Sequence, residues 1–297
     1  MKTVYGILIA FILILLVAFV YSPHEDEDVV ISALSSDLSK PEFVQYSEVN
    51  LPEKELVAIP DSNPYVQQVV ADYNYFIEQA IKKGMAPGAA VAIVRDTSII
   101  FLKGFGLRQV GHADSIDVNT VFRLGSVSKC FSSVLAGTLV SDHLMNWDDP
   151  IVKYYPEFQL KSKEHTEKLT IRNVLSHTTG LPYHAYTNMI EEHIPLDTLL
   201  ASLKSVSLFG EPGQIYSYQN VGYSLIEKVV QAVSHQSFEA ALTEHVFKPL
   251  KMRNSSASYE AIMSHENVAR PHFFSRKHWV SVPISDTYYN VTPAGGV

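Results

Sequence analysis

The chain has 297 residues, of which 46% are hydrophobic and 18% are charged, and it carries a formal net charge of −8 and one cysteine. This length and composition indicate a globular protein of one or two domains that can bury a sizeable core. The acidic balance without a basic cluster argues against a nucleic-acid partner, and the single Cys130 excludes an intramolecular disulfide and a zinc site built from cysteines.

The amino end carries a nearly unbroken apolar run from Thr3 to Ser22, with Lys2 before it and an acidic segment, 25–28, after it. A run of about 18–20 residues fits a membrane span better than the shorter core of a signal peptide. A positive charge before it and acidic residues after it predict that the amino end stays in the cytoplasm. We therefore expect residues 1–22 to be an uncleaved single-pass anchor in the inner or cell membrane, with the remainder facing the periplasm or the exterior. The alternative is a cleaved signal peptide and a secreted protein.

Residues 23–62 are polar and acidic without clear periodicity, which is typical of a flexible linker. The domain at 63–297 is then predicted to begin with a helix, because Asn63 is a favourable cap and Pro64 suits a first turn. Apolar residues recur at helical spacing up to Ile81, and Gly84 follows as a stop signal, so this helix is amphipathic.

Two apolar and β-branched runs follow at 89–95 and 98–105, on either side of Asp96-Thr97. They predict a β-hairpin. With helices before and after it, the hairpin indicates an α/β (α+β) fold in which an antiparallel sheet is flanked by helices.

The segment 124–141 predicts the helix around which the chain is organised. Its apolar residues recur at spacings of three and four: Val127, Phe131, Val134, Leu135 and Leu139. The remaining positions are small apart from one lysine, and a helix without a polar outer face is expected in the interior of a protein. There Cys130 would be inert packing.

Lys129 is the one charge on this helix, and lysine is rarely buried without a partner. Ser126 lies three residues earlier, on the same helical face. A hydroxyl beside a partly desolvated amine can be made nucleophilic. The alternative is a surface helix whose lysine reaches water, and the missing polar face favours the functional interpretation.

From about residue 142 to 260 the sequence predicts a mainly helical subdomain, with helices at 170–177, 221–233 and 238–247. The sequence then ends on a loop signal, Pro293-Ala-Gly-Gly-Val297. Because a hairpin alone is not a stable sheet, we expect the sheet to be incomplete and the domain to be C-terminally truncated or a fragment.

Five motifs occur in order along the chain. They are Phe122-Arg-Leu-Gly-Ser-Val-Ser-Lys129, Asp148-Asp-Pro-Ile-Val-Lys-Tyr-Tyr-Pro-Glu-Phe158, Leu169-Thr-Ile-Arg-Asn-Val-Leu-Ser-His-Thr-Thr-Gly-Leu-Pro182, Gly213-Gln-Ile-Tyr-Ser-Tyr-Gln-Asn-Val-Gly-Tyr223 and Pro249-Leu-Lys-Met252. Together they resemble the serine β-lactamase family, in the branch shared by class C β-lactamases, DD-peptidases and related esterases. The resemblance runs from about residue 64 to the last residue. It implies a β-lactamase/transpeptidase-like fold, with the nucleophile in a Ser-x-x-Lys motif.

This resemblance assigns the nucleophile to Ser126 and its basic partner to Lys129. The family's second motif, Tyr-x-Asn, occurs three times in the chain, beginning at Tyr186, Tyr218 and Tyr288. We choose the motif at Tyr218, because it follows a glycine turn and precedes a predicted helix, as the family's motif does.

The resemblance implies that Tyr218 carries protons and that Asn220 holds Lys129 and the substrate amide. Whether Lys129 or Tyr218 is the base stays open on the sequence alone. The structural alternatives are core packing for Tyr218 and a helix cap for Asn220. The backbone N–H of Ser126 would be one oxyanion donor.

The family's third motif, Lys-Thr-Gly or His-x-Gly on a late strand, supplies a second oxyanion donor. No such motif follows Tyr218, and Gly295-Gly296 resembles the loop that precedes it. One such donor can be worth ~100- to 1000-fold in turnover. Two functions therefore follow: a serine hydrolase that forms an acyl-enzyme from an amide, β-lactam or ester, or a catalytically impaired, membrane-tethered binding or regulatory protein of the same fold.

The implied partners are a small-molecule or peptidoglycan-peptide substrate and the membrane, through the N-terminal segment. No metal or organic cofactor is implied, and the twelve histidines show no metal-ligand spacing. His177 is expected to be structural, because it follows a short helix and precedes a turn.

Overall fold

The computed structural model describes residues 57–297. The predicted anchor at 1–22 and the linker as far as residue 56 lie outside the described residues. Within the described part of the chain, no helix combines the length and the apolar character needed to cross a bilayer.

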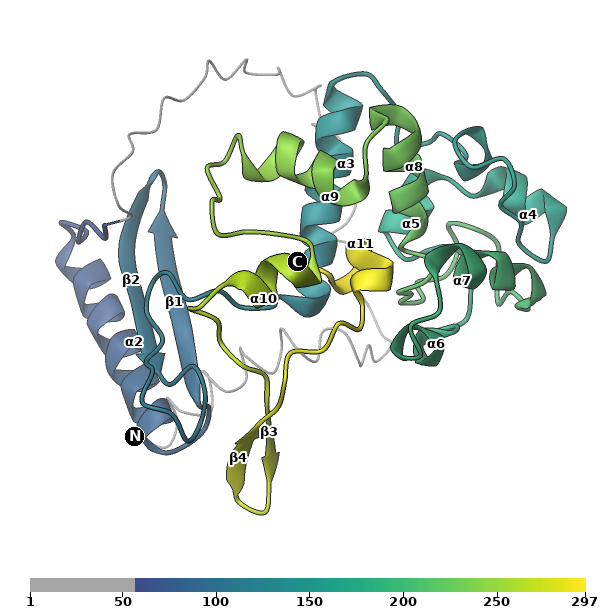
Figure 1. The fold of residues 1–297 in the computed structure, drawn as a ribbon. Helices are drawn as coiled ribbons and strands as arrows, with labels where there is room; N and C mark the ends of the chain where they lie inside the picture. The colour runs from purple at the N-terminus through teal and green to yellow at the C-terminus, as the bar shows by residue number, and fades with distance from the viewer. Residues whose placement is uncertain (1–56) are drawn as a thin grey trace, which may run out of the picture. The chain divides into compact units, whose positions relative to one another are not determined.

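Helix α2 (Pro64–Lys82) packs against a hairpin of β1 (Gly88–Arg95) and β2 (Ser98–Gly106) (Figure 1). The side chain of Asn63 accepts a hydrogen bond from the backbone N–H of Tyr65 at 2.9 Å, so the predicted cap is confirmed. Every residue of α2 keeps some exposure, because the helix contacts the sheet along one side.

The strands β1 and β2 pair antiparallel, from Gly88 opposite Gly106 to Arg95 opposite Ser98. Asp96, in the turn, has a φ of 54°, the left-handed conformation that two-residue hairpin turns require. The predicted hairpin is confirmed.

The predicted central helix is also confirmed, as α3 (Ser128–Ser141), preceded by the 3₁₀ turn η1 (Gly125–Val127). Gly125 has a φ of +54°, which glycine adopts without the steric cost that other residues carry. This tight entry places Ser126 in the 3₁₀ turn and Lys129 in the first turn of α3.

The outer face of α3 differs from the prediction. Val127 is 53% exposed and Val134 is 51% exposed, and Cys130 is exposed as well. These positions share one side of the helix, whereas the buried Leu135 and Leu139 lie toward the other described helices. The expectation of a helix buried on all sides, with Cys130 as part of the packing, was therefore wrong, because the described elements pack on one side of α3.

Short helices follow α3. The 3₁₀ segments are η2 (Ile151–Lys153) and η3 (Leu203–Ser205), and the helices are α4 (Lys163–Lys168), α5 (Ile171–Leu175), α6 (Thr187–Glu191), α7 (Leu196–Ser202), α8 (Leu225–Ser234), α9 (Phe238–Leu242) with the π turn η4 (Thr243–Phe247), and α10 (Tyr259–Ser264). Thr170 and Asn173 form a capping box at the start of α5. The helix predicted from residue 221 begins four residues later, because residues 221–224 form turns.

The main core lies between α3 and these helices. Leu135 and Leu139 of α3 belong to one buried cluster with Val229 of α8 and Leu242 of α9, and all four are fully buried. Burial of each such side chain contributes roughly 1.5–3 kcal/mol. The helical core therefore fixes the position of α3, on which Ser126 and Lys129 depend.

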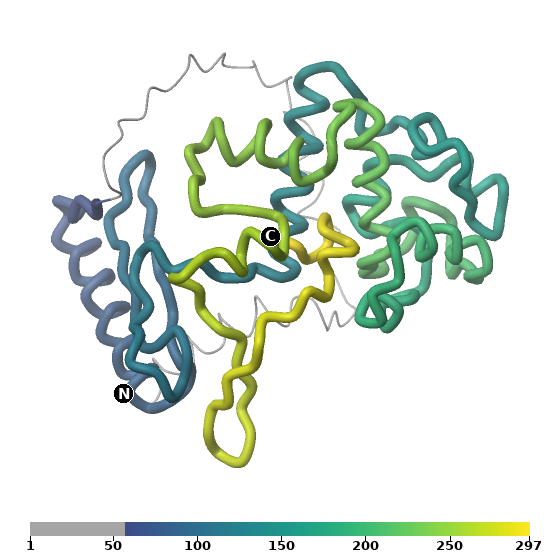
Figure 2. Tube along the Cα trace, viewed as in Figure 1, coloured from purple at the N-terminus to yellow at the C-terminus, as the bar shows by residue number. Residues whose placement is uncertain are grey.

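The last described segment returns to α3. A second hairpin, β3 (His272–Ser275) and β4 (His278–Ser281), forms a separate two-stranded sheet, and η5 (Tyr289–Val291) and α11 (Thr292–Gly295) follow it. Figure 2 shows this yellow segment running from the hairpin to α3, which α11 contacts.

Glu227 of α8 is a partly buried carboxyl that accepts one hydrogen bond, from Gln231 at 3.2 Å. Burial, with a smaller contribution from Glu239, raises its pKa to about 7. A raised carboxyl pKa means that the folded state binds more protons than the unfolded state. This contribution to stability is present below the unfolded pKa near 4.5 and is lost as the pH rises through 7.

We therefore expect Glu227→Gln to increase the unfolding free energy at pH 8 by roughly 1–2 kcal/mol and by much less at pH 5. Urea melts of the full chain at both pH values would measure this, with the exposed Glu191→Gln as the control. An equal gain at both pH values would contradict a buried, partly protonated Glu227.

Candidate active site

Ser126 and Tyr218 meet through a direct hydrogen bond. The Tyr218 hydroxyl donates to Ser126 Oγ at 2.8 Å, although the two residues are 92 positions apart. Ser126 is exposed in the 3₁₀ turn before α3, and Tyr218 lies in the loop before α8. The serine oxygen is thus accessible from solvent and already hydrogen-bonded to a second acid–base group.

Lys129 lies next to the ring of Tyr218 and is 7% exposed. Its Nζ donates to Asn220 Oδ1 at 2.8 Å and to the Ala294 carbonyl at 2.9 Å, and it lies 4.6 Å from the centre of the Tyr218 ring. An amide, a carbonyl and an aromatic ring carry no net charge. Burial therefore lowers the pKa of Lys129 to about 8.

The Tyr218 phenol has the opposite tendency. Burial raises its pKa by more than the hydrogen bond with Ser126 lowers it. Tyr218 is accordingly a neutral phenol near pH 7, while an appreciable fraction of Lys129 is a neutral amine.

Of the three Tyr-x-Asn motifs, the one beginning at Tyr218 contributes to this cluster. Tyr186 packs against the main core, with its hydroxyl 3.4 Å from the Ser202 carbonyl, and Tyr288 lies against Gly295. Asn220 does not cap α8, whose N-cap is Ser224. The structure thus brings together all four residues selected from the sequence.

The backbone at 293–297 is hydrogen-bonded to Lys129 and to neighbouring residues at the start of α3. Besides the Ala294 carbonyl, the Pro293 carbonyl accepts from Ser132 Oγ at 2.8 Å. The Val297 N–H donates to Ser128 Oγ at 2.9 Å, and the Val297 carbonyl accepts from the Leu124 N–H at 2.9 Å. Sequence patterns identify side chains, so they gave no signal for these carbonyl partners.

Arg123 binds the backbone of the residues that precede this segment. Its guanidinium donates to the Ser285 carbonyl at 2.6 Å and to the Thr287 carbonyl, and it lies 4.8 Å from the centre of the Tyr289 ring. Because Arg123 is three residues before Ser126, one short stretch both presents the serine and fixes the segment that contacts Lys129.

Two further aromatic residues of the site were not predicted. Tyr223 donates to the Lys129 carbonyl at 2.8 Å and shares a hydrogen bond with Ser133, and burial raises its pKa to about 12. His177, expected to be structural, lies with its ring centre 4.5 Å from that of Tyr218. Both residues lie within the motifs that carry the family resemblance, but the order of motifs along a chain does not specify which side chains are in contact.

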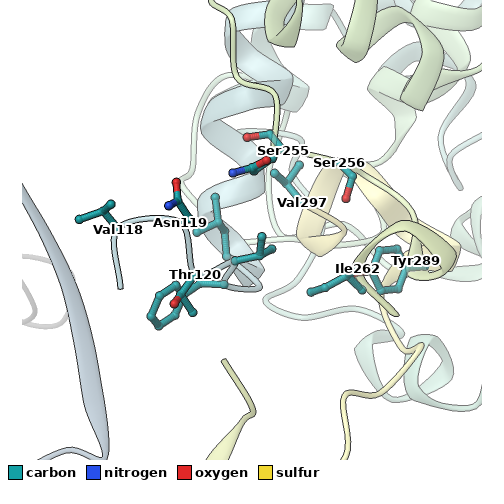
Figure 3. Close-up of a pocket in the computed structure, with 12 residues that line it drawn as sticks. Val118, Asn119, Thr120, Ser255, Ser256, Ile262, Tyr289 and Val297 are labelled. Atoms are coloured by element: carbon teal, nitrogen blue, oxygen red, sulfur yellow. The ribbon is translucent and has the colours of Figure 1, made fainter. Parts of the chain in front are cut away.

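A pocket of about 250 Å³ opens beside the start of α3 (Figure 3). It is lined by uncharged polar and apolar side chains, among them Asn119, Ser256, Tyr289 and Val297. A second pocket, of about 480 Å³, includes Gly125 in its lining. Ser126 is not among the residues that line either of these two pockets.

Among the described residues, no group of three or more His, Cys, Asp and Glu side chains is placed to hold a metal ion.

Comparison with known proteins gives a consistent family. The family model described as Beta-lactamase matches residues 77–297. Protein flp of Staphylococcus aureus is 26% identical over 182 residues, which cover 61% of this chain and 36% of flp. The chain thus spans about a third of the length of that curated relative.

Solved structures share the fold. A penicillin-binding protein homologue from Pyrococcus abyssi, described as octameric, superimposes with a TM-score of 0.65 at 24% identity, over 76% of this chain and 52% of that one. EstCE1, described as a hydrolase with promiscuous acyltransferase activity, gives a TM-score of 0.66 at 20% identity, over 77% of this chain and 68% of that one. The predicted β-lactamase/transpeptidase-like α+β fold is confirmed.

The pKa of Lys129 can be measured without assuming a reaction. In the full chain carrying ¹³C-labelled lysine, one Cε resonance is expected to titrate near pH 8, because the amine is buried among neutral partners. Lys129→Met identifies that resonance by removing it. The exposed Lys153, whose pKa is raised by Asp149, serves as the control. Titration of the Lys129 resonance at the ordinary lysine pKa would contradict the described burial.

Proposed function

Because the chain belongs to the β-lactamase family, we propose that it is a serine acyl hydrolase that forms an acyl-enzyme on Ser126 from an amide, a β-lactam or an ester. The observation that carries this proposal is the connected cluster in which Tyr218 bonds Ser126 while Lys129 lies against the Tyr218 ring and bonds Asn220. A hydroxyl, a partly neutral amine and a phenol in contact are the groups that acyl transfer requires.

In the proposed first step, Ser126 Oγ forms a bond to the substrate carbonyl carbon. The serine proton passes to the neutral amine of Lys129, directly or through the Tyr218 phenol, and then to the departing nitrogen or oxygen as its bond to the carbonyl carbon breaks. Water attacks the resulting ester in the second step, releases the acid and restores the serine hydroxyl.

The directions of the two pKa shifts favour Lys129 as the base. Burial raises the pKa of Tyr218, so a phenolate is scarce near neutral pH, whereas the pKa of Lys129 is lowered to about 8. A base works best when its pKa lies near the working pH. In this proposal Tyr218 carries the proton, Asn220 orients the amine, and the backbone N–H of Ser126 stabilises the oxyanion.

The descriptions of two solved structural relatives suggest candidate substrates. One solved neighbour is a penicillin-binding protein homologue, and another is a hydrolase with promiscuous acyltransferase activity. A penicillin and a small activated ester, 4-nitrophenyl acetate, therefore represent the lactam and ester classes.

Intact mass spectrometry tests the proposal. The full chain, incubated with benzylpenicillin or with 4-nitrophenyl acetate, is expected to gain the mass of one acyl group, and Ser126→Ala is expected to gain none while keeping its circular dichroism spectrum. The solvent-exposed Ser264→Ala is the matched control and should label like the wild type. A folded wild-type chain without any adduct, or an adduct retained by Ser126→Ala, would refute the assignment and favour the binding or regulatory alternative.

We also propose that residues 1–22 tether the chain to the inner or cell membrane, with the domain facing the periplasm or the exterior. The support is the uninterrupted apolar run, its single preceding lysine and the acidic residues that follow it.

Alkaline phosphatase fused after residue 62 is expected to be active in a bacterial host, because that enzyme requires an exported, disulfide-permissive compartment. The same fusion lacking residues 1–22 is the control and should be inactive. Equal activity of the two fusions would contradict the proposed topology, and release of active enzyme into the soluble fraction would identify a cleaved signal.

A further inference from the structure

His177 packs against two tyrosines of the site and makes no hydrogen bond to Ser126. It follows α5, has a φ of 58° and is 8% exposed. Its ring centre is 4.5 Å from that of Tyr218 and 5.0 Å from that of Tyr223, with both ring planes inclined by 31°. The imidazole therefore occupies the space between the tyrosine that contacts Ser126 and the one that contacts the Lys129 backbone.

The backbone around Tyr218 is bonded to His177 on both sides. The Gln219 N–H donates to His177 Nδ1 at 3.1 Å, and the Ser217 N–H donates to the His177 carbonyl at 2.8 Å. Tyr218 itself is held through its carbonyl, which accepts from the His184 N–H at 3.0 Å. Residues 217–219 are thus fixed by three hydrogen bonds, and one of them depends on a side chain.

That side-chain bond requires a neutral imidazole, because Nδ1 can accept a hydrogen bond only when it carries no proton. The groups that surround the ring are the amine of Lys129 on α3, the rings of Tyr216, Tyr218 and Tyr223, and the backbone of 217–219. Burial, and then the charge of Lys129, lower the pKa of His177 to about 4. Near neutral pH, the predominant form of His177 is therefore the neutral imidazole, which can accept this hydrogen bond.

We propose that His177 is a positioning residue of the acylation reaction: its unprotonated Nδ1 anchors the Gln219 N–H and so holds the Tyr218 hydroxyl at hydrogen-bonding distance from Ser126 Oγ. This role rests on the proposed function. His177 acts through the backbone of its neighbour, and it reaches Ser126 only by way of Tyr218.

Two substitutions separate the hydrogen bond from the packing. His177→Asn keeps an acceptor close to the Nδ1 position and suits the positive φ, but it loses the ring that packs between the tyrosines. His177→Phe keeps a ring of similar size but leaves the buried Gln219 N–H without its acceptor. If His177 is purely structural, the acylation rate of both variants will fall in proportion to their loss of stability. If His177 is a positioning acceptor, the acylation rate will be retained in the variant that keeps the acceptor and lost in the variant that lacks it.

The experiment measures the second-order rate of serine labelling by a fluorophosphonate at pH 7.5, beside the melting temperature, for the full chain and each variant. His177→Asn is expected to label within about threefold of the wild type, and His177→Phe at least tenfold more slowly, even where His177→Asn melts at the lower temperature. Leu199→Ala, in the buried core of α7, is the control for loss of stability alone. Amide hydrogen exchange at Gln219 is expected to accelerate in His177→Phe and to stay protected in His177→Asn.

Equal labelling rates in the two His177 variants, or rates that follow the melting temperatures and the Leu199→Ala control, would overturn the positioning role while leaving the acyl-serine proposal intact. A wild-type chain that takes no Ser126-dependent label would instead overturn the proposed function, and with it any role of His177 in that reaction. The two failures are therefore distinguishable.

Discussion

An amine that leaves water loses its hydration, and Lys129 replaces that hydration with neutral groups: the Asn220 amide oxygen, the Ala294 carbonyl and the ring of Tyr218. A carboxylate in place of any of these would hold the ammonium form and keep the pKa of the lysine high. The three neutral groups do not stabilise the ammonium in this way, so burial lowers the pKa of Lys129 to about 8. Burying the amine is unfavourable because it loses its hydration. The packing of the helical core around α3 offsets this desolvation free energy and keeps the lysine in place.

The partners of Lys129 come from segments far apart in the chain. Tyr218 and Asn220 lie in the loop before α8, and Ala294 lies in α11. Arg123 binds the carbonyls of Ser285 and Thr287, which connects the entry to α3 with the segment that leads to α11. Displacement of that segment would remove a partner from the buried amine, so the acid–base properties of the site depend on the packing of 285–297.

Tyr218, which contacts Ser126, is held in place by hydrogen bonds to its backbone and its neighbours. Tyr218 projects from a loop, and loops are usually less precisely held than helices. Here its neighbours in the chain are bonded to His177 and its carbonyl to His184, so the phenol is fixed by local hydrogen bonds rather than by a helix. A buried neutral histidine can accept such a bond without adding charge next to Lys129.

The sequence by itself determined the helix at α2, the hairpin β1–β2, the central helix with Ser126 and Lys129, and the family-level fold, because periodicity, caps and motif order are local properties of the chain. It also ranked Tyr218 over Tyr186 and Tyr288 from its glycine turn. Tertiary structure decided what is non-local: which face of α3 is covered, so that Val134 and Cys130 are exposed, and which groups surround the lysine. A carbonyl such as that of Ala294 has no sequence signature, and the value of a pKa depends on burial, which no local pattern specifies.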